Sequence, residues 1–220
     1  MRSRRVVAFD LDGCILDSTE PIFQCLNGAL AELDLAPLSI DDLAPRVGPP
    51  LQLMLAELLA EREADPSLVE PLVSAYRERY RTESLRLAVT YPGIDDLLAA
   101  LASGERLAVC TSKPSRWAVP ILEHLGLAGL FEHIAGPGLT EAESKSDTLA
   151  RLLADLEPLD ARRSVMIGDR HHDIDAARHH GLVPVGVTWG FGTRDELESA
   201  GAVAVVDRPD EVPGVLAGLG

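Results

Sequence analysis

Short runs of apolar residues alternate with longer amphipathic segments along much of the chain. Runs of about five residues are typical of buried strands, and apolar residues that recur every three or four positions are typical of helices. The strand-like runs are 5–9, 106–110, 164–168 and 183–187, and the helix-like stretches between them are 93–101, 115–125, 146–156 and 173–180. Because strands that alternate with helices build parallel sheets, the sequence predicts an α/β fold with helices on both faces of the sheet.

Residues 16–87 interrupt this alternation. Three stretches, 21–35, 51–62 and 66–84, have the apolar spacing of helices, and no strand-like run separates them. We therefore predict that 16–87 form an α-helical domain inserted into the sheet domain, which itself comprises 1–15 and 88–220.

Acidic residues follow two of the strand-like runs. Asp10 and Asp12 come directly after the first run, and Asp169 and Asp173 follow the third. Ligands of parallel sheets bind beyond the carboxyl ends of the strands, so we expect these four carboxylates to lie near one another there. They would repel each other unless a cation neutralised them, and ligation by oxygen alone favours magnesium over zinc. The alternatives are that the first two are ordinary turn residues and that Asp173 only caps the following helix.

Groups that could hold an oxyanion follow another run. Thr111 and Ser112 come after the run at 106–110 and offer hydroxyl and backbone N–H groups. Lys145 is one of only two lysines in the chain and precedes a helix-like stretch, where it could place a positive charge on a phosphoryl group. The alternative is that the first two are turn residues and that the lysine is a solvated surface residue.

The overall charge restricts the partners. The 220 residues carry a formal net charge of −15, which argues against nucleic acid and against an anionic membrane surface. No stretch approaches the roughly 18 apolar residues that a membrane span needs, and the basic start is not followed by an export segment. The three scattered cysteines fit a reducing compartment, so we expect a cytoplasmic protein. A chain this acidic needs local positive charge to bind a phosphate.

Together these motifs resemble those of the haloacid dehalogenase-like hydrolase superfamily. Its four motifs are Asp-x-Asp-Gly, a Thr or Ser after an apolar strand, a Lys, and Gly-Asp-x-x-x-Asp. All four occur here in that order, as Asp10-Leu-Asp12-Gly13, Thr111, Lys145, and Gly168-Asp169 with Asp173. Segments 47–51, 91–94 and 187–192 are similar to the phosphoglycolate phosphatase-like branch. Cys14 departs from that branch, which usually has Thr or Val at this position.

The resemblance implies a Rossmann-like catalytic core with 16–87 as a small helical cap, and magnesium-dependent hydrolysis of a small phosphorylated metabolite. Asp10 would attack phosphorus to form an aspartyl-phosphate. Asp12 would protonate the leaving alkoxide and later take a proton from water. Magnesium would be held by Asp10, the backbone carbonyl of Asp12, Asp169 and Asp173, the last directly or through water.

The resemblance also implies the residues that bind substrate. Thr111, Ser112 and Lys145 would hold the phosphoryl oxygens. In the cap, Arg46 is our candidate for a residue that reaches the substrate, and an ordinary surface arginine is the alternative. Phosphoglycolate, a nucleoside monophosphate and a sugar phosphate are all candidate substrates, and a homodimer is compatible with the sequence.

Two other groups of residues in the sequence are compatible with different chemistry. Cys110 to Arg116 matches the Cys-x5-Arg spacing of cysteine phosphatases, but it lacks glycine and contains Pro114, which removes an N–H donor. Histidines at 171, 172, 179 and 180 could bind a transition metal or simply form a polar helix face. A sugar phosphomutase of the same fold and a non-enzymatic phosphate-sensing module are the functional alternatives. Asp12 and the inserted domain favour hydrolysis over a sensor.

Overall fold

One parallel sheet of six strands organises the described part of the chain, residues 5–138 and 143–219 of this computed structural model. The strands are β1 (Val6–Phe9), β2 (Arg106–Cys110), β3 (His133–Ala135), β4 (Val165–Gly168), β5 (Val183–Val187) and β6 (Ala204–Val206). Their spatial order is β3-β2-β1-β4-β5-β6. All four expected strands are present, and β3 and β6 are additional short strands at the two edges.

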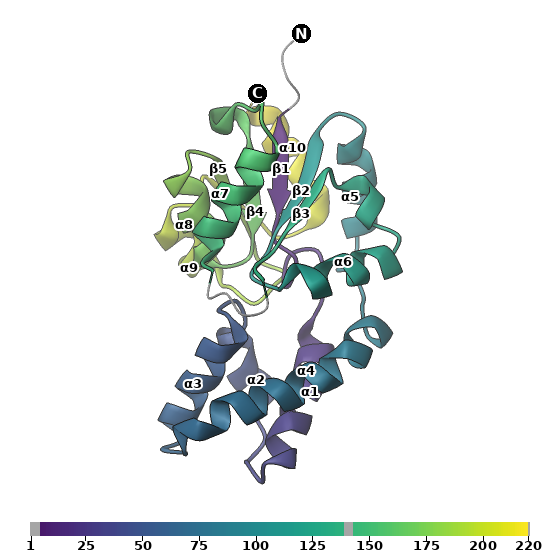
Figure 1. Ribbon diagram of the computed structural model, residues 1–220. Helices are drawn as coiled ribbons and strands as arrows, with labels where there is room; N and C mark the ends of the chain where they lie inside the picture. The colour runs from purple at the N-terminus through teal and green to yellow at the C-terminus, as the bar shows by residue number, and fades with distance from the viewer. Residues whose placement is uncertain (1–4, 139–142, 220) are drawn as a thin grey trace. The chain divides into compact units, whose positions relative to one another are not determined.

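Strand β1 lies at the centre of the sheet, between β2 and β4 (Figure 1). All four of its residues are buried, as expected for a strand that is covered on both faces. Val7 pairs with Leu107 of β2 on one side and with Val165 of β4 on the other. The chain segments that follow β1, β2 and β4 therefore leave the sheet at neighbouring points on one edge.

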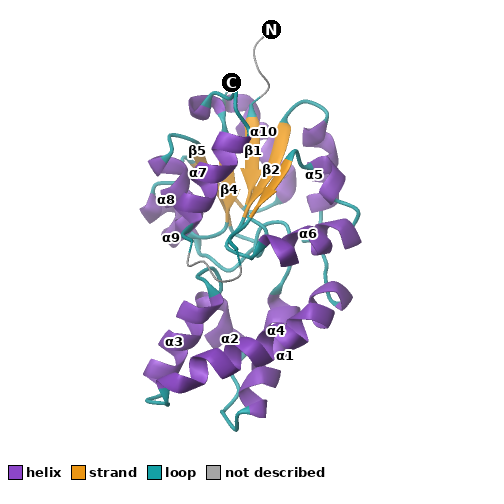
Figure 2. Ribbon diagram, viewed as in Figure 1, coloured by secondary structure: helices purple, strands orange, loops and turns teal. Residues whose placement is uncertain are grey.

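Helices lie on both sides of the sheet (Figure 2). Helices α7 and α8 pack side by side, α7 against β2 and β3 and α8 against β4 and β5. They share an apolar core with residues such as Ala8, Met166 and Leu149. The helices of the sheet region are α5 (Ile94–Ala102), α6 (Ser115–His124), α7 (Lys145–Asp155), α8 (His171–His179), α9 (Arg194–Ala200) and α10 (Val212–Gly218). The predicted α/β architecture is confirmed.

The chain divides into two compact units, one formed by Met1–Asp17 with Val89–Gly220 and the other by Ser18–Ala88. The second unit is helical, and α4 packs against both α1 and α3 within it. Its helices are α1 (Thr19–Glu32), α2 (Ile40–Leu43), α3 (Leu51–Glu61) and α4 (Val69–Arg86). That this unit acts as a cap stays a prediction. None of the helices in the described residues is both long enough and apolar enough to cross a membrane.

A tight turn follows β1 and ends where the chain leaves the sheet unit. Gly13 has a φ of +82°, a conformation that side chains disfavour, and the carbonyl of Leu11 accepts hydrogen bonds from the N–H groups of Ile15 and Leu16. Leu16 then pairs in antiparallel fashion with Thr90. The outgoing and returning chain segments thus lie side by side within the same unit.

Candidate active site

Three buried carboxylates, which we call the acid cluster, meet where β1 and β4 end. They belong to Asp10, Asp169 and Asp173, and each offers an oxygen within 4.8 Å of the others. Asp173 is the third residue of α8, where its Oδ2 accepts a hydrogen bond from the N–H of Arg170. It therefore stabilises the start of that helix as well as joining the cluster, so the two interpretations of this residue are compatible.

Lys145 supplies the positive charge that faces the acid cluster. Its Nζ lies 2.8 Å from Oδ1 of Asp10 and 2.8 Å from Oδ1 of Asp173. It is the first residue of α7, and a capping box between Ser144 and Asp147 fixes the helix start. Because Lys145 is only 8% exposed, its ammonium is directed into the protein and is not a solvated surface group.

One lysine does not neutralise three buried carboxylates. Burial raises the pKa of Asp10 to about 7, and repulsion from Asp173 adds to that effect although Lys145 opposes it. Burial also raises the pKa of Asp169, with further repulsion from the other two acids. The pKa of Lys145 is raised despite burial, because Asp10 and Asp173 stabilise its charged form. The cluster therefore favours the binding of additional positive charge.

One of the two carboxylate oxygens of Asp169 is buried and has no hydrogen-bond partner among the described residues. This oxygen is Oδ1, whereas Oδ2 accepts a hydrogen bond of 2.7 Å from the backbone N–H of Phe191. A buried, unpaired carboxylate oxygen beside two further carboxylates is a suitable ligand for a hard divalent cation. The residues present therefore fit a metal ion with oxygen ligands.

The segment after β5 packs closely against this carboxylate. A side chain at Gly190 would collide with the carbonyl oxygen of Gly13 and with the carboxylate of Asp169. The indole Nε1 of Trp189 donates a hydrogen bond of 2.9 Å to the carbonyl of Cys14. The sequence gives no indication of these contacts, because neither a hydrogen bond from a backbone amide nor tight packing against a glycine produces a sequence motif.

Asp12 is paired with a lysine that was not among the expected site residues. Nζ of Lys113 lies 2.7 Å from Oδ1 of Asp12, and Lys113 is only 9% exposed. The signal was present in the sequence, since Lys113 follows the polar residues after β2 and is the other of the two lysines.

The remaining expected residues lie in two places. Thr111 is buried at the end of β2, where its Oγ1 accepts a hydrogen bond from the N–H of Lys113, and the adjacent Ser112 is half-buried. Arg46 lies in the helical unit, where it forms a two-pronged ion pair with Glu61 at 3.0 and 2.6 Å. Their roles toward a substrate stay predictions.

The cysteine and histidine alternatives lose support. Cys110 is buried within β2, and burial raises the pKa of its thiol to about 12, which leaves it protonated and unreactive at neutral pH. The acid cluster contains no histidine, and it is the one group of potential metal ligands found in the described part of the chain. His171 instead contacts Glu196, and His180 contacts Ser146.

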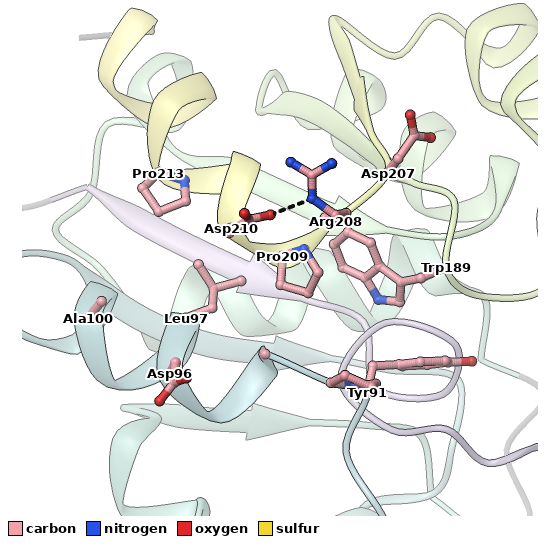
Figure 3. A pocket seen from close by; sticks show the side chains of 12 residues that line it. Tyr91, Asp96, Leu97, Ala100, Trp189, Asp207, Arg208, Pro209, Asp210 and Pro213 are labelled. Atoms are coloured by element: carbon pink, nitrogen blue, oxygen red, sulfur yellow. Dashed lines mark hydrogen bonds and ion pairs between the residues drawn. The ribbon is translucent and has the colours of Figure 1, made fainter.

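A separate groove of about 600 Å³ lies between α5 and the segment that leads into α10. Figure 3 shows Trp189 and Tyr91 at one end, with Pro209 beside the indole and Leu97 farther along. None of the acid-cluster residues lines it. The groove is therefore distinct from the place where the carboxylates and Lys145 meet.

Comparison with known proteins identifies relatives over most of the chain. Residues 7–187 match the family model described as "Haloacid dehalogenase-like hydrolase". The chain is 39% identical to the tyrosine-protein kinase PtkA of Mycobacterium tuberculosis over 92% of this chain and 68% of that protein. It is 38% identical to a phosphoglycolate phosphatase of Agrobacterium fabrum over 83% and 80% of the two chains. The crystal structure of a predicted phosphatase from Clostridium acetobutylicum superimposes with a TM-score of 0.88 at 32% identity, covering 98% and 99% of the chains.

Proposed function

Because this chain belongs to the haloacid dehalogenase-like hydrolase family, we propose that it hydrolyses a small phosphomonoester with Mg²⁺ through a phosphate bound covalently to Asp10. The chain is a phosphatase, as its family and its phosphatase relatives indicate. The observation that carries the proposal is the buried cluster in which Lys145 bridges Asp10 and Asp173.

The acid cluster supports the metal part of the proposal. Asp10, Asp169 and Asp173 would hold Mg²⁺, with the backbone carbonyl of Asp12 as a further ligand, and Asp173 would ligate directly or through water. When bound, the cation would neutralise charge on the phosphoryl oxygens. The unpaired Oδ1 of Asp169 and the insufficient positive charge around three carboxylates support this assignment.

Asp10 would carry out the first half of the reaction. Its Oδ1 already contacts Lys145 and accepts a hydrogen bond from the N–H of Leu11, which leaves Oδ2 to attack phosphorus. The bond from phosphorus to the ester oxygen breaks as the new bond forms, and Asp12 gives its proton to the departing alkoxide. Thr111, Ser112 and Lys145 would hold the phosphoryl oxygens in place.

The second half of the reaction returns the enzyme to its starting state. Asp12, now a carboxylate, would take a proton from a water molecule that attacks phosphorus. The bond between phosphorus and Asp10 then breaks, so inorganic phosphate leaves and Asp12 is protonated again. One phosphomonoester and one water are consumed for each alcohol and phosphate released.

The substrate class is small and soluble in our proposal. The 38% identity to a phosphoglycolate phosphatase of Agrobacterium fabrum favours phosphoglycolate as the substrate. A nucleoside monophosphate and a sugar phosphate are the other candidates to test. The helical unit would act as the cap that selects among them, and Arg46 would contact the leaving group.

A second candidate function is phosphoryl transfer to protein tyrosine, and the identity of 39% to PtkA favours testing it. It needs a nucleoside triphosphate as donor and a tyrosine hydroxyl as acceptor. An attack by Asp10 followed by transfer to tyrosine would use the same cluster. The two functions therefore differ in the phosphoryl donor and in the acceptor, which is water in one case and a tyrosine hydroxyl in the other.

One experiment tests both. Phosphate release is measured from a panel of phosphoglycolate, nucleoside monophosphates and sugar phosphates, with Mg²⁺ and with excess chelator, and tyrosine phosphorylation is measured with ATP and a tyrosine peptide. We expect hydrolysis that requires Mg²⁺, a phosphopeptide containing Asp10 after acid quenching, and loss of both with Asp10→Asn. Asp95→Asn removes an exposed carboxylate of α5 and serves as the control. Undiminished turnover in chelator or by Asp10→Asn would contradict the mechanism, and phosphotyrosine without hydrolysis would favour the second candidate.

A further inference from the structure

Lys113 is fixed beside the carboxylate that is proposed to protonate the leaving group. It follows Thr111 and Ser112 after β2, the strand next to β1 in the sheet. Its backbone N–H donates to Oγ1 of Thr111 over 3.0 Å, and its Nζ contacts Oδ1 of Asp12 over 2.7 Å. The lysine is thus held at its backbone and at the end of its side chain.

The two lysines of the chain contact different carboxylates of the site. Nζ of Lys145 contacts Asp10 and Asp173, the acids that would face the phosphoryl group. Nζ of Lys113 contacts Asp12, whose proton would pass to the oxygen of the leaving alcohol. The ammonium of Lys113 therefore lies toward the leaving-group side of the reacting bond. Phosphoryl transfer itself does not require a cation on that side in addition to Lys145.

We infer that Lys113 is a specificity-determining residue that favours phosphomonoesters whose alcohol carries an anionic group close to the ester oxygen. This inference rests on the proposed function. An ammonium has three N–H donors, so Lys113 can contact Asp12 and pair with a carboxylate of the substrate at the same time. A charge-assisted hydrogen bond of this kind is stronger than one between neutral groups.

The negative charge of the surroundings makes the ion pair between Lys113 and an anionic substrate group important for binding. The chain has a net charge of −15, and the acid cluster lies next to the reacting bond. A second negative charge on the alcohol would be repelled there unless a cation stood beside it. Lys113 provides that cation at a side-chain exposure of only 7%, where water weakens the interaction less than at the surface.

The test compares two substrates that differ by one charge. 2-Phosphoglycolate and its amide, 2-phosphoglycolamide, have nearly the same size, and kcat and KM are measured for each with saturating Mg²⁺. We expect the wild-type protein to prefer the acid by roughly tenfold or more in kcat/KM, mainly through KM, as the loss of one charge-assisted contact implies. Lys113→Met should remove the preference, and Lys113→Arg should restore part of it.

The control is Arg116→Met, which removes an exposed cation of α6 three residues away and should keep the wild-type preference. Circular dichroism checks that each variant folds, and Lys113→Gln replaces Lys113→Met if the latter does not. Equal losses on both substrates would mean that Lys113 acts only on Asp12 and would overturn the inference. Equal turnover of both substrates by the wild type would also overturn it while leaving the proposed function intact. Failure to hydrolyse any ester would instead contradict the proposed function.

Discussion

In the proposed mechanism Asp10 has to be ionised to attack phosphorus, yet burial and the neighbouring Asp173 raise its pKa to about 7. The energetic cost of holding three carboxylates together is therefore part of the folded state. A cation bound at this site would relieve the repulsion among the carboxylates that the folded protein holds together.

The pKa of Asp10 predicts how pH changes stability. Its ordinary value is 3.8, so between about pH 4 and 7 the metal-free folded protein keeps a proton that the unfolded chain has lost. The stability of the metal-free protein should fall as pH rises through this window. Metal competes with that proton, so the rise in Tm on adding Mg²⁺ should be larger at pH 8 than at pH 5.5.

Thermal unfolding with and without Mg²⁺ at the two pH values checks this. Asp169→Asn, which removes one carboxylate and its charge, should abolish most of the effect. An increase in Tm that is independent of pH would show that no carboxylate of the cluster releases a proton on binding metal.

The sequence predicted that the polar residues after β1, β2 and β4 would come together, because the carboxyl ends of neighbouring parallel strands leave the sheet at one edge. Asp10, Asp169 and Asp173 follow β1 and β4 and do lie together. Lys145, which begins α7, contacts Asp10 and Asp173 from outside that set of strand ends. The same reasoning did not reach the pairing of Lys113 with Asp12, because the direction of a single long side chain has no periodic signature.

The segment after β5 connects two parts of the site that are far apart in the chain. The indole N–H of Trp189 donates a hydrogen bond to the carbonyl of Cys14 in the turn after β1. The backbone N–H of Phe191 donates a hydrogen bond to the carboxylate of Asp169 after β4. Gly190 lies between them with no space for a side chain. This short segment therefore determines the orientation of one proposed metal ligand.

Gly190→Ala should weaken metal binding more than it weakens the fold. Its methyl group would displace either the carboxylate of Asp169 or the carbonyl of Gly13, and overpacking of this kind costs about 1–3 kcal/mol. We expect the Mg²⁺ concentration at half-maximal activity to rise about tenfold or more if that energy is taken from metal binding. Gly104→Ala is the matched control, because a Cβ there meets no atom within 4 Å. Unchanged Mg²⁺ dependence with lowered Tm would assign the segment a purely structural role.

The elements that the sequence did not predict are short ones. Strands β3 and β6 have three residues each and lie at the edges of the sheet, and the first two residues of each are only partly buried. The central strands were predictable because burial on both faces requires an unbroken apolar run. Edge strands are under no such requirement, and β3 includes the polar His133.

The net charge of −15 acts on every anionic substrate that approaches the protein. At about 0.01 M salt the field extends some 30 Å, and at 0.15 M only about 8 Å. Raising the salt concentration over this range should therefore increase kcat/KM for a doubly charged phosphomonoester, by about twofold or more.

Steady-state kinetics at saturating Mg²⁺ checks this, with phosphocholine as a control because its positive group offsets part of the phosphate charge. The control should respond less. A decrease in kcat/KM with salt for the doubly charged ester would mean that the local cations, and not the overall charge, govern the encounter.

The pairing of Leu16 with Thr90 has a consequence for how such a protein can diverge. The chain leaves the sheet unit and re-enters it at adjacent points. There the N–H of Asp17 donates a hydrogen bond to the carbonyl of Val89. Everything between them is topologically a single loop, and the entropy of closing a loop grows only slowly with its length. The inserted unit can therefore be lengthened, shortened or exchanged during evolution without altering the register of β1 or the placement of the acid cluster. The residues of the acid cluster and the inserted helical unit can therefore change independently of each other during evolution.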